Sequence, residues 1–197
     1  MILEGIVTTL SPEGLLNVAP MGPQVDDTWR RYILRPYRTS TTYRNLKARG
    51  EGVLHVTDDV LLLARSAVGP AVEVATRPAD AVAGRIILDA CRYYEFRVTE
   101  LDDRDDRTTI VVETVAEGRH RDFFGFNRAK HAVIEAAILA TRTALLPREE
   151  ILAEFERLAV LVAKTGGPAE HAAFDHLKKY LNEAALFGDP HQDGLRP

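Results

Sequence analysis

The sequence predicts an α+β fold, with an antiparallel barrel or strongly curved sheet in the first part of the chain and helices in the last part. Short extended segments separated by turn residues fill the chain up to about residue 125. From residue 127 onward, apolar residues recur at helical spacing instead. A parallel, doubly wound sheet is disfavoured because long helices do not separate the strands and no glycine-rich nucleotide-binding fingerprint occurs.

The first two expected strands form a hairpin. Residues 2–10 alternate and are rich in β-branched side chains, Ser11-Pro12-Glu13-Gly14 supplies a turn, and residues 15–21 resume the extended pattern. The later expected strands cover residues 31–34, 53–57, 71–76, 93–101 and 107–115. The last two flank the charged loop 102–106, which predicts a long hairpin with an exposed tip.

Helix signals occur in both parts of the chain. Residues 40–49 begin with hydroxyl residues and precede Gly50, and Asp58-Asp59 can cap a short helix through Ala64. The three later helices start near Asn127, at Pro147 and after the Thr165-Gly166-Gly167-Pro168 break, and Gly188 ends the third. We therefore expect a barrel domain over 1–125, a helical subdomain over 126–190 that packs on the barrel or on a dimer partner, and a frayed tail over 191–197.

The helix from Arg128 to Thr143 is apolar on nearly all sides. A helix on the surface of a monomer should show one polar face, so this pattern is a clue to dimerisation. Burial by the two following helices of the same chain is the alternative.

Composition restricts the function classes. A chain of 197 residues with 46% hydrophobic residues can bury a substantial core, and its net charge of −4 provides no field for a nucleic acid. The single cysteine, Cys91, excludes an intramolecular disulfide and favours a packing role and a cytoplasmic location. No apolar run approaches the roughly 20 residues that span a bilayer, so no membrane partner is expected. The histidines lack metal-ligand spacing, which predicts no metal site.

Three arginines and four consecutive hydroxyl residues gather where a strand runs into a helix, in the segment Arg35-Pro36-Tyr37-Arg38-Thr39-Ser40-Thr41-Thr42-Tyr43-Arg44-Asn45-Leu46. Free N–H groups at a helix start, hydroxyl donors and guanidinium groups all suit a phosphate. The alternative is that Ser40 or Thr41 only caps the helix while the arginines are solvated. Capping needs one hydroxyl and no arginines, so we favour phosphate binding.

A second segment, Asn17-Val18-Ala19-Pro20-Met21-Gly22-Pro23, ends a strand with small residues, a proline and a glycine. Such a strand lets a planar ligand approach the backbone closely. By itself this pattern is a weak signal, and an ordinary strand that ends in a turn is the favoured explanation.

Together with Glu4-Gly5-Ile6-Val7-Thr8-Thr9 and Phe126-Asn127-Arg128-Ala129-Lys130-His131-Ala132-Val133-Ile134-Glu135-Ala136, these segments resemble the domain of unknown function 447 family. That family is grouped with the flavin-reductase-like, FMN-binding split β-barrels of the pyridoxamine phosphate oxidase-like superfamily. The resemblance covers most of the chain, from Ile2 to about Leu146. The match to the pyridoxamine phosphate oxidase branch itself is only architectural.

The resemblance implies a homodimer with FMN in a groove at or near the subunit interface. The residues it assigns to the phosphate are Arg35, Thr39, Ser40 and Thr41, with Arg38 and Arg44 as supporting charges. Near the flavin ring it places Asn17, Ala19, Pro20 and Met21, and Asn45 and His55 are expected to line the same groove. The catalytic residues are unknown.

Two function classes follow from this resemblance. The first is an FMN-dependent oxidoreductase of flavin-reductase type, with NAD(P)H as the expected electron source, in which the cofactor carries the chemistry. The alternative is a non-catalytic module that binds FMN or another phosphorylated ligand, because one fold hosts several functions.

Two features near residue 127 are open to structural interpretation. Asn127-Arg128 and Lys130-His131 could place positive charge near a flavin, or Asn127 could be a helix cap beside solvated basic residues. Phe123, Phe124 and Phe126 are expected to lie in the core or in a dimer interface.

Overall fold

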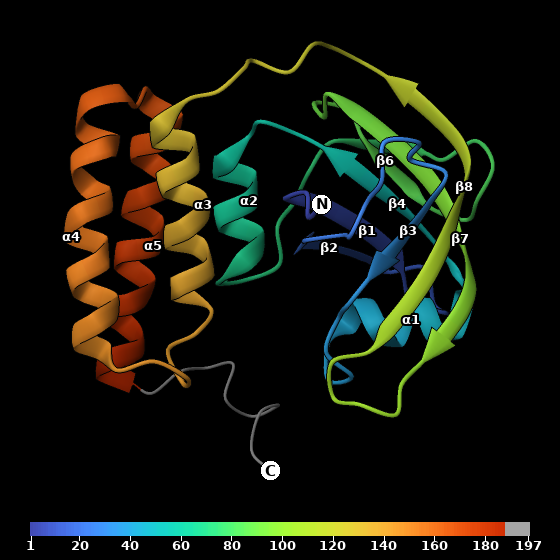
Figure 1. The fold of residues 1–197 in the computed structure, drawn as a ribbon, viewed down its shortest axis with the longest axis horizontal. Coiled ribbons are helices and arrows are strands. Elements are labelled where there is room, and N and C mark those ends of the chain that lie inside the picture. The colour runs from blue at the N-terminus through green and yellow to red at the C-terminus, as the bar shows by residue number, and fades with distance from the viewer. Residues whose placement is uncertain (188–197) are drawn as a thin grey trace. The chain divides into compact units, whose positions relative to one another are not determined.

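The computed structural model describes residues 1–187 and divides into two compact units (Figure 1). The first contains Met1–Thr57 and Glu73–Phe123, and the second contains Asp58–Val72 and the chain from Phe124 onward. The barrel domain expected from the sequence therefore loses residues 58–72, which pack with the later helices. The expected frayed tail, 191–197, lies outside the described residues.

The first unit is built on a six-stranded antiparallel sheet with the order β2-β1-β4-β7-β8-β3. Its strands are β1 (Gly5–Leu10), β2 (Leu16–Met21), β3 (Arg31–Leu34), β4 (Glu51–Val56), β7 (Arg92–Asp102) and β8 (Thr109–Arg119). A separate pair is formed by β5 (Thr76–Pro78) and β6 (Arg85–Ile87). The expected α+β class, with its early hairpin and its long β7–β8 hairpin, is confirmed.

Short bridges join the two ends of this sheet. Gln24 pairs on one side with Ile2, just before β1, and on the other side with Ile33 of β3. The Gln24 N–H donates to the Ile33 carbonyl at 2.9 Å, and Leu3 donates to Pro23 at 3.1 Å. These bonds close the curved sheet into a barrel and satisfy backbone groups that an open edge would leave unpaired.

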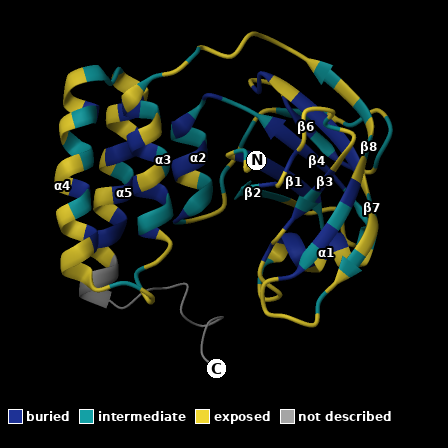
Figure 2. Cartoon of the chain, viewed as in Figure 1, coloured by how far each residue is buried: buried dark blue, intermediate teal, exposed yellow. Residues whose placement is uncertain are grey.

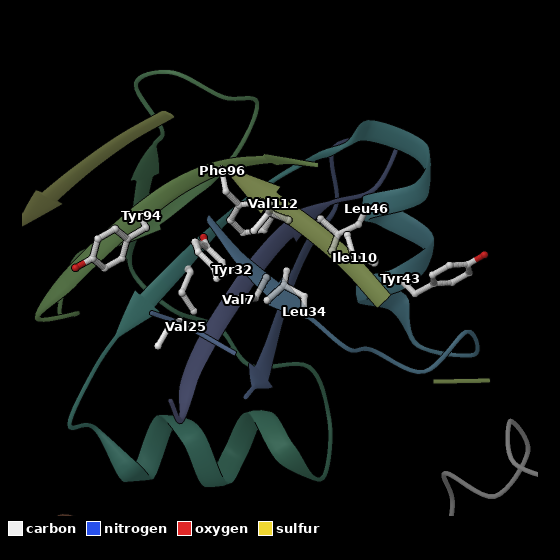
Figure 3. Packing of buried hydrophobic residues seen from close by; sticks show 11 residues of the cluster. Val7, Val25, Tyr32, Leu34, Tyr43, Leu46, Tyr94, Phe96, Ile110 and Val112 are labelled. Carbon is white, nitrogen blue, oxygen red and sulfur yellow. The ribbon is translucent and has the colours of Figure 1, made fainter. Parts of the chain in front are cut away.

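The barrel interior is one apolar cluster. Its largest fully buried side chains, each at most 1% exposed, include Tyr32, Phe96, Leu34 and Leu46 (Figure 3). Tyr32 and Phe96 meet edge to face with their centroids 5.9 Å apart. Figure 2 shows the central strands β1 and β4 as largely buried, in agreement with this core.

The helix α1 (Thr41–Arg49) packs on β1 and β2, and Leu46 carries its apolar side into the core. Gly50 ends it in the left-handed region, with φ of 69°, where a glycine has no Cβ to clash. The Gly50 N–H closes the last turn by donating to the Leu46 carbonyl at 2.8 Å. This helix forms where the sequence predicts it. Its packing on β1 and β2 fixes its position on the barrel.

The second unit consists of α2 (Val60–Ala67), α3 (Arg128–Ala140), α4 (Arg148–Thr165) and α5 (Pro168–Phe187). The apolar face of α3 is covered by the other three helices of its own chain, and its buried residues are Ala129, Ala132, Val133, Ala136, Ala137 and Ala140. The apolar character of α3 is thus explained without a partner and is no clue to dimerisation. No helix within residues 1–187 combines the length and the apolar character needed to cross a membrane.

Lys130 joins three segments of the second unit. Its ammonium group forms a 2.8 Å ion pair with Glu170, donates to the Asp58 carbonyl at 2.7 Å and lies over the Phe124 ring. Asn127 caps α3 by accepting from the Lys130 N–H at 3.0 Å. The ion pair and the Gly167 N–H lower the pKa of Glu170, although its burial opposes them and is the largest single influence. Lys130 is therefore a structural group of this unit and not a solvated charge.

Two expectations from the sequence are wrong. Residues 71–75 form no strand, because β5 begins only at Thr76, and β6 was not predicted because three residues carry too little pattern. A core position for Phe123, Phe124 and Phe126 is also wrong, because they are 49%, 74% and 94% exposed, while the alternative position in a dimer interface stays a prediction.

His55 of β4 is a polar residue with 0% exposure, on the strand face opposite to that of its neighbour Leu54 in the apolar cluster. Its Nε2 accepts from the Ile87 N–H at 3.0 Å, which leaves Nδ1 to donate to the Ile6 carbonyl at 3.2 Å. The neutral ring therefore ties β4 to β1 and β6. Burial lowers the pKa of His55 from 6.5 to about 4, against the opposing effect of the Ile6 carbonyl.

This burial predicts a loss of stability in mild acid. Since the unfolded state takes up a proton near pH 6.5 and the folded state only near pH 4, the stability that is present above pH 6.5 falls as the pH decreases through this window. We expect a loss of about 2 kcal/mol between pH 8 and pH 5 in urea unfolding, and a clearly smaller loss for His55→Gln. The exposed His171, replaced by Gln, is the control and should behave like the wild type. The same pH dependence in all three proteins would contradict the assignment.

Candidate functional site

Ser40 shapes the start of α1. It is the N-cap residue, and its hydroxyl accepts from the Tyr43 N–H at 3.2 Å and donates to the Tyr37 carbonyl at 2.7 Å. The Ser40 N–H also donates to the Tyr37 carbonyl, at 2.9 Å. No acidic residue lies in the first turn of α1. The positive end of the helix therefore follows directly on a tight, hydrogen-bonded turn, which consists of residues 35–40.

The other hydroxyl residues of this segment have separate environments. Thr39 and Thr41 are exposed, whereas Thr42 is buried. Thr42 accepts from the side-chain amide of Asn17 at 3.1 Å. The N–H groups of Thr41 and Thr42 precede the first N–H that a helical carbonyl can satisfy, so they point out of the helix end. Capping thus uses one hydroxyl, which leaves Thr39, Thr41 and two N–H groups for a ligand.

Three arginines surround this turn. Arg35, Arg38 and Arg44 are all exposed, and within residues 1–187 none of them forms an ion pair. Arg44 donates to the Thr41 hydroxyl at 3.1 Å, from one turn along the helix. Their guanidinium groups are consequently free to bind an anion at the helix start.

The tip of the β7–β8 hairpin holds this turn from the other side. The Arg38 N–H donates to the Asp106 carbonyl at 2.9 Å. Thr108 donates to the Pro36 carbonyl through both its N–H, at 3.0 Å, and its hydroxyl, at 2.7 Å. The sequence indicated only an exposed loop here, because contacts between residues some 70 positions apart leave no local pattern.

Asp103 of the same tip fixes the body of α1. Its carboxylate accepts from the Tyr43 hydroxyl at 2.6 Å and from Lys47 at 2.7 Å, and Lys47 also reaches the Tyr43 oxygen at 3.0 Å. Figure 3 shows the Tyr43 hydroxyl directed away from the apolar cluster. The Lys47 and Tyr43 hydrogen bonds lower the pKa of Asp103, and Arg38 contributes through its charge.

A buried polar network joins α1 to the first hairpin. The Thr9 hydroxyl, in a residue only 1% exposed, accepts from the amide of Asn45 at 3.0 Å and from the amide of Asn17 at 3.2 Å. Because Asn17 also reaches Thr42, the network brings β2 and the start of α1 together. The two segments selected from the sequence therefore meet in space.

The β2 candidates are divided between two faces of the edge strand. Asn17, Ala19 and Met21 pair with Thr9, Val7 and Gly5 of β1, respectively, and alternate with Pro20. Met21 packs against the apolar cluster. Asn17 and Ala19 thus share the face on which α1 packs, while Pro20 lies on the opposite face at a sheet edge, where its missing N–H leaves no ladder bond unmade.

Two of the sequence candidates are interior groups. Asn45 is 4% exposed and donates to Thr9, and both ring nitrogens of His55 are bonded to backbone. We assign both a structural role and do not include them among the residues that contact a ligand. Cys91 is also buried and forms no disulfide.

A cavity of about 390 Å³ in the first unit is lined by Val56, Cys91, Arg92, Arg121, Asp122 and Phe123. None of the sequence candidates lines it. Arg121 is engaged there with the Asp89 carbonyl at 3.0 Å, so its guanidinium is already occupied by backbone.

Comparison with protein families decides the identity of the chain. Residues 3–121 match the N-terminal domain model, and residues 127–179 the second model, of the protein of unknown function DUF447. The chain belongs to the DUF447 family. The resemblance found in the sequence is thereby confirmed, and the two models meet close to the boundary between the barrel and α3. No curated protein matches the chain.

Solved structures show the same fold. An FMN-bound DUF447 protein from Methanosarcina mazei has a TM-score of 0.78 and 23% identity, over 91% of this chain and 94% of that one. Flavin reductase HpaC, complexed with NADP+, has a TM-score of 0.55 and 20% identity, over 64% of this chain and 82% of that one. The 2-nitrobenzoate 2-nitroreductase of Pseudomonas fluorescens has a TM-score of 0.52 and 18% identity, over 59% and 64%. The similarity to the two reductases covers about 60% of this DUF447 chain.

The polar network below α1 predicts a specific stability cost. Thr9→Val keeps the side-chain shape but removes the acceptor for the buried amide of Asn45 and the half-buried amide of Asn17, so we expect a destabilisation of about 2–3 kcal/mol in urea unfolding. The control is Thr99→Val, because the Thr99 hydroxyl is exposed and makes one 3.2 Å bond to the Val111 carbonyl. It should cost less than about 0.5 kcal/mol. Equal effects of the two changes would show that the network does not anchor α1.

Proposed function

We propose that this DUF447 protein binds FMN with its phosphate at the start of α1. The observation that carries the proposal is the gathering of Arg35, Arg38 and Arg44 around a capped helix start, all without carboxylate partners in the described chain. The donor set suits a phosphate dianion, because guanidinium forks, hydroxyls and helix N–H groups are the donors that phosphate sites use, and this one short segment supplies all three. The FMN-bound Methanosarcina mazei relative supports the choice of ligand.

Each residue of the segment has a distinct role in this proposal. Arg35, Arg38 and Arg44 neutralise the phosphate, and Thr39 and Thr41 donate their hydroxyls to it. Ser40 acts indirectly, since its hydroxyl is used to shape the turn. Asp103 and Thr108 hold α1 and the turn in place from the hairpin tip.

The flavin ring would lie along β2. Asn17 and Ala19 share the face next to the start of α1, and the small side chain of Ala19 allows a planar group to approach the backbone. Met21 and Pro20 would border the ring from further along the strand. A strand at the edge of a sheet offers its backbone without a competing neighbour on that side.

We further propose an oxidoreductase of flavin-reductase type, in which NAD(P)H reduces the bound flavin. FMN, when bound, would supply the hydride and electron chemistry, and the chain would orient the ring and exclude competing reactions. Support comes from the fold shared with HpaC, whose structure contains NADP+. A homodimer is part of the same proposal and rests on the family resemblance.

The phosphate assignment predicts a selective loss of affinity. Arg35→Ala combined with Arg44→Ala should weaken FMN binding by about 2–4 kcal/mol, since a hydrogen bond to a charged group contributes about 1.5–3 kcal/mol before solvent screening. Riboflavin binding should stay unchanged, because riboflavin lacks the phosphate. Quenching of flavin fluorescence measures both affinities.

Arg30→Ala is the matched control for this double variant, because Arg30 is exposed and lies before β3, outside the segment. It should bind FMN as the wild type does. Ser40→Ala is a less suitable test of the phosphate site than the double arginine variant, since it also removes the cap of α1. A wild-type protein that binds FMN and riboflavin equally well would contradict the phosphate site.

Anaerobic addition of NADH or NADPH to the FMN-loaded protein separates the oxidoreductase from the alternative, a non-catalytic FMN module. Turnover requires bleaching of the visible flavin absorbance within seconds to minutes. Bound FMN that dithionite bleaches but neither nicotinamide reduces would favour the non-catalytic module.

A further inference from the structure

Arg107 is a fourth arginine beside the candidate phosphate turn, and the sequence segment does not contain it. It lies in the tip of the β7–β8 hairpin, two residues before β8, and forms an isolated β-bridge with Tyr37. Its guanidinium carbon lies 5.6 Å from the centroid of the Tyr37 ring, and its Nε donates to the Arg35 carbonyl at 3.3 Å. Two residues of the turn therefore position this side chain.

The backbone around Arg107 is firmly attached to the same turn. Asp106 accepts from Arg38 on one side, and the buried Thr108 donates twice to Pro36 on the other. The turn continues directly into the Ser40 cap through the Tyr37 carbonyl. Arg107 is thus tied, by backbone bonds of its neighbours and not only by its own long side chain, to the segment that leads into the start of α1.

The charge of Arg107 is not used elsewhere in the described part of the chain. It forms no ion pair there, whereas its neighbour Arg104 is paired with Asp102, whose pKa this pair lowers to about 2. Asp103 is likewise taken by Lys47. Asp105 and Asp106 are exposed and reduce the local positive potential, but neither forms an ion pair with Arg107. The hairpin tip therefore carries two arginines: Arg104 is neutralised by Asp102, and Arg107 can bind an anion.

We propose that Arg107 is a specificity-determining residue of the FMN site, which donates to the phosphate from the hairpin side while Tyr37 holds its guanidinium in place. The inference rests on the proposed FMN function and adds a second structural element to it. The phosphate dianion would be gripped between the start of α1 and the hairpin tip. A planar guanidinium stacked on an aromatic ring loses little conformational freedom when it binds an anion, which suits this role.

The proposal predicts how the preference for a phosphorylated flavin changes. Arg107→Ala should lower FMN affinity roughly tenfold, the effect of one charge-assisted hydrogen bond at an exposed site, and leave riboflavin affinity unchanged. The loss should shrink as salt is raised, because exposed charges are screened. The matched control, Arg104→Ala on the same tip, should keep the wild-type ratio of the two affinities.

The role of Tyr37 is tested by a double-mutant cycle. Tyr37→Leu should weaken FMN binding less than Arg107→Ala does, and should cause no further loss when Arg107 is already Ala. Additive losses would overturn the positioning role of Tyr37.

Failure of this inference is distinguishable from failure of the proposed function. If the wild type prefers FMN and the Arg35 and Arg44 variant loses that preference while Arg107→Ala retains it, the site stands and the role of Arg107 is overturned. If the wild type shows no preference for FMN, both are overturned. Equal losses for FMN and riboflavin in Arg107→Ala would show a structural effect and would also overturn the proposal.

Discussion

The candidate site depends on one buried hydroxyl, that of Thr9. It accepts hydrogen bonds from the side-chain amides of Asn17, on the edge strand β2, and Asn45, on α1. Because unpaired amide groups are costly in a barrel interior, this acceptor fixes the helix on the hairpin. Asn17 also donates to the Thr42 hydroxyl, and this second hydrogen bond fixes the first turn of α1 against β2.

The polar side chains near this anchor fall into two sets: those that form hydrogen bonds within the protein, and those that are exposed and can bind a ligand. Ser40, Thr42, Asn45 and Tyr43 are used internally, while Thr39, Thr41 and the arginines of the turn point to solvent. The overall net charge is −4, so positive potential exists only locally, where arginines lack acidic partners. A small anion such as a phosphate fits this arrangement better than a polyanion does.

Local patterns made much of this predictable. The α1 boundaries followed from hydroxyls before the helix and Gly50 after it, and both long hairpins followed from alternation and turn residues. The use of Thr9, Asp103 and Arg107 could not be predicted, because each acts across contacts of about 30 to 70 positions. For the same reason, His55 was expected in a groove although its buried ring is bonded to the backbone of β1 and β6, and residues 58–72 were expected in the barrel domain although they pack with the later helices.

Hydrogen–deuterium exchange with and without flavin tests the central claim most directly, because it locates the ligand on the chain. The account predicts that FMN slows amide exchange at the start of α1, in peptides covering Thr39–Tyr43, and at the hairpin tip around Asp106–Thr108. Riboflavin should leave these peptides unchanged. Protection by FMN confined to other parts of the chain, with the start of α1 exchanging as before, would contradict the account.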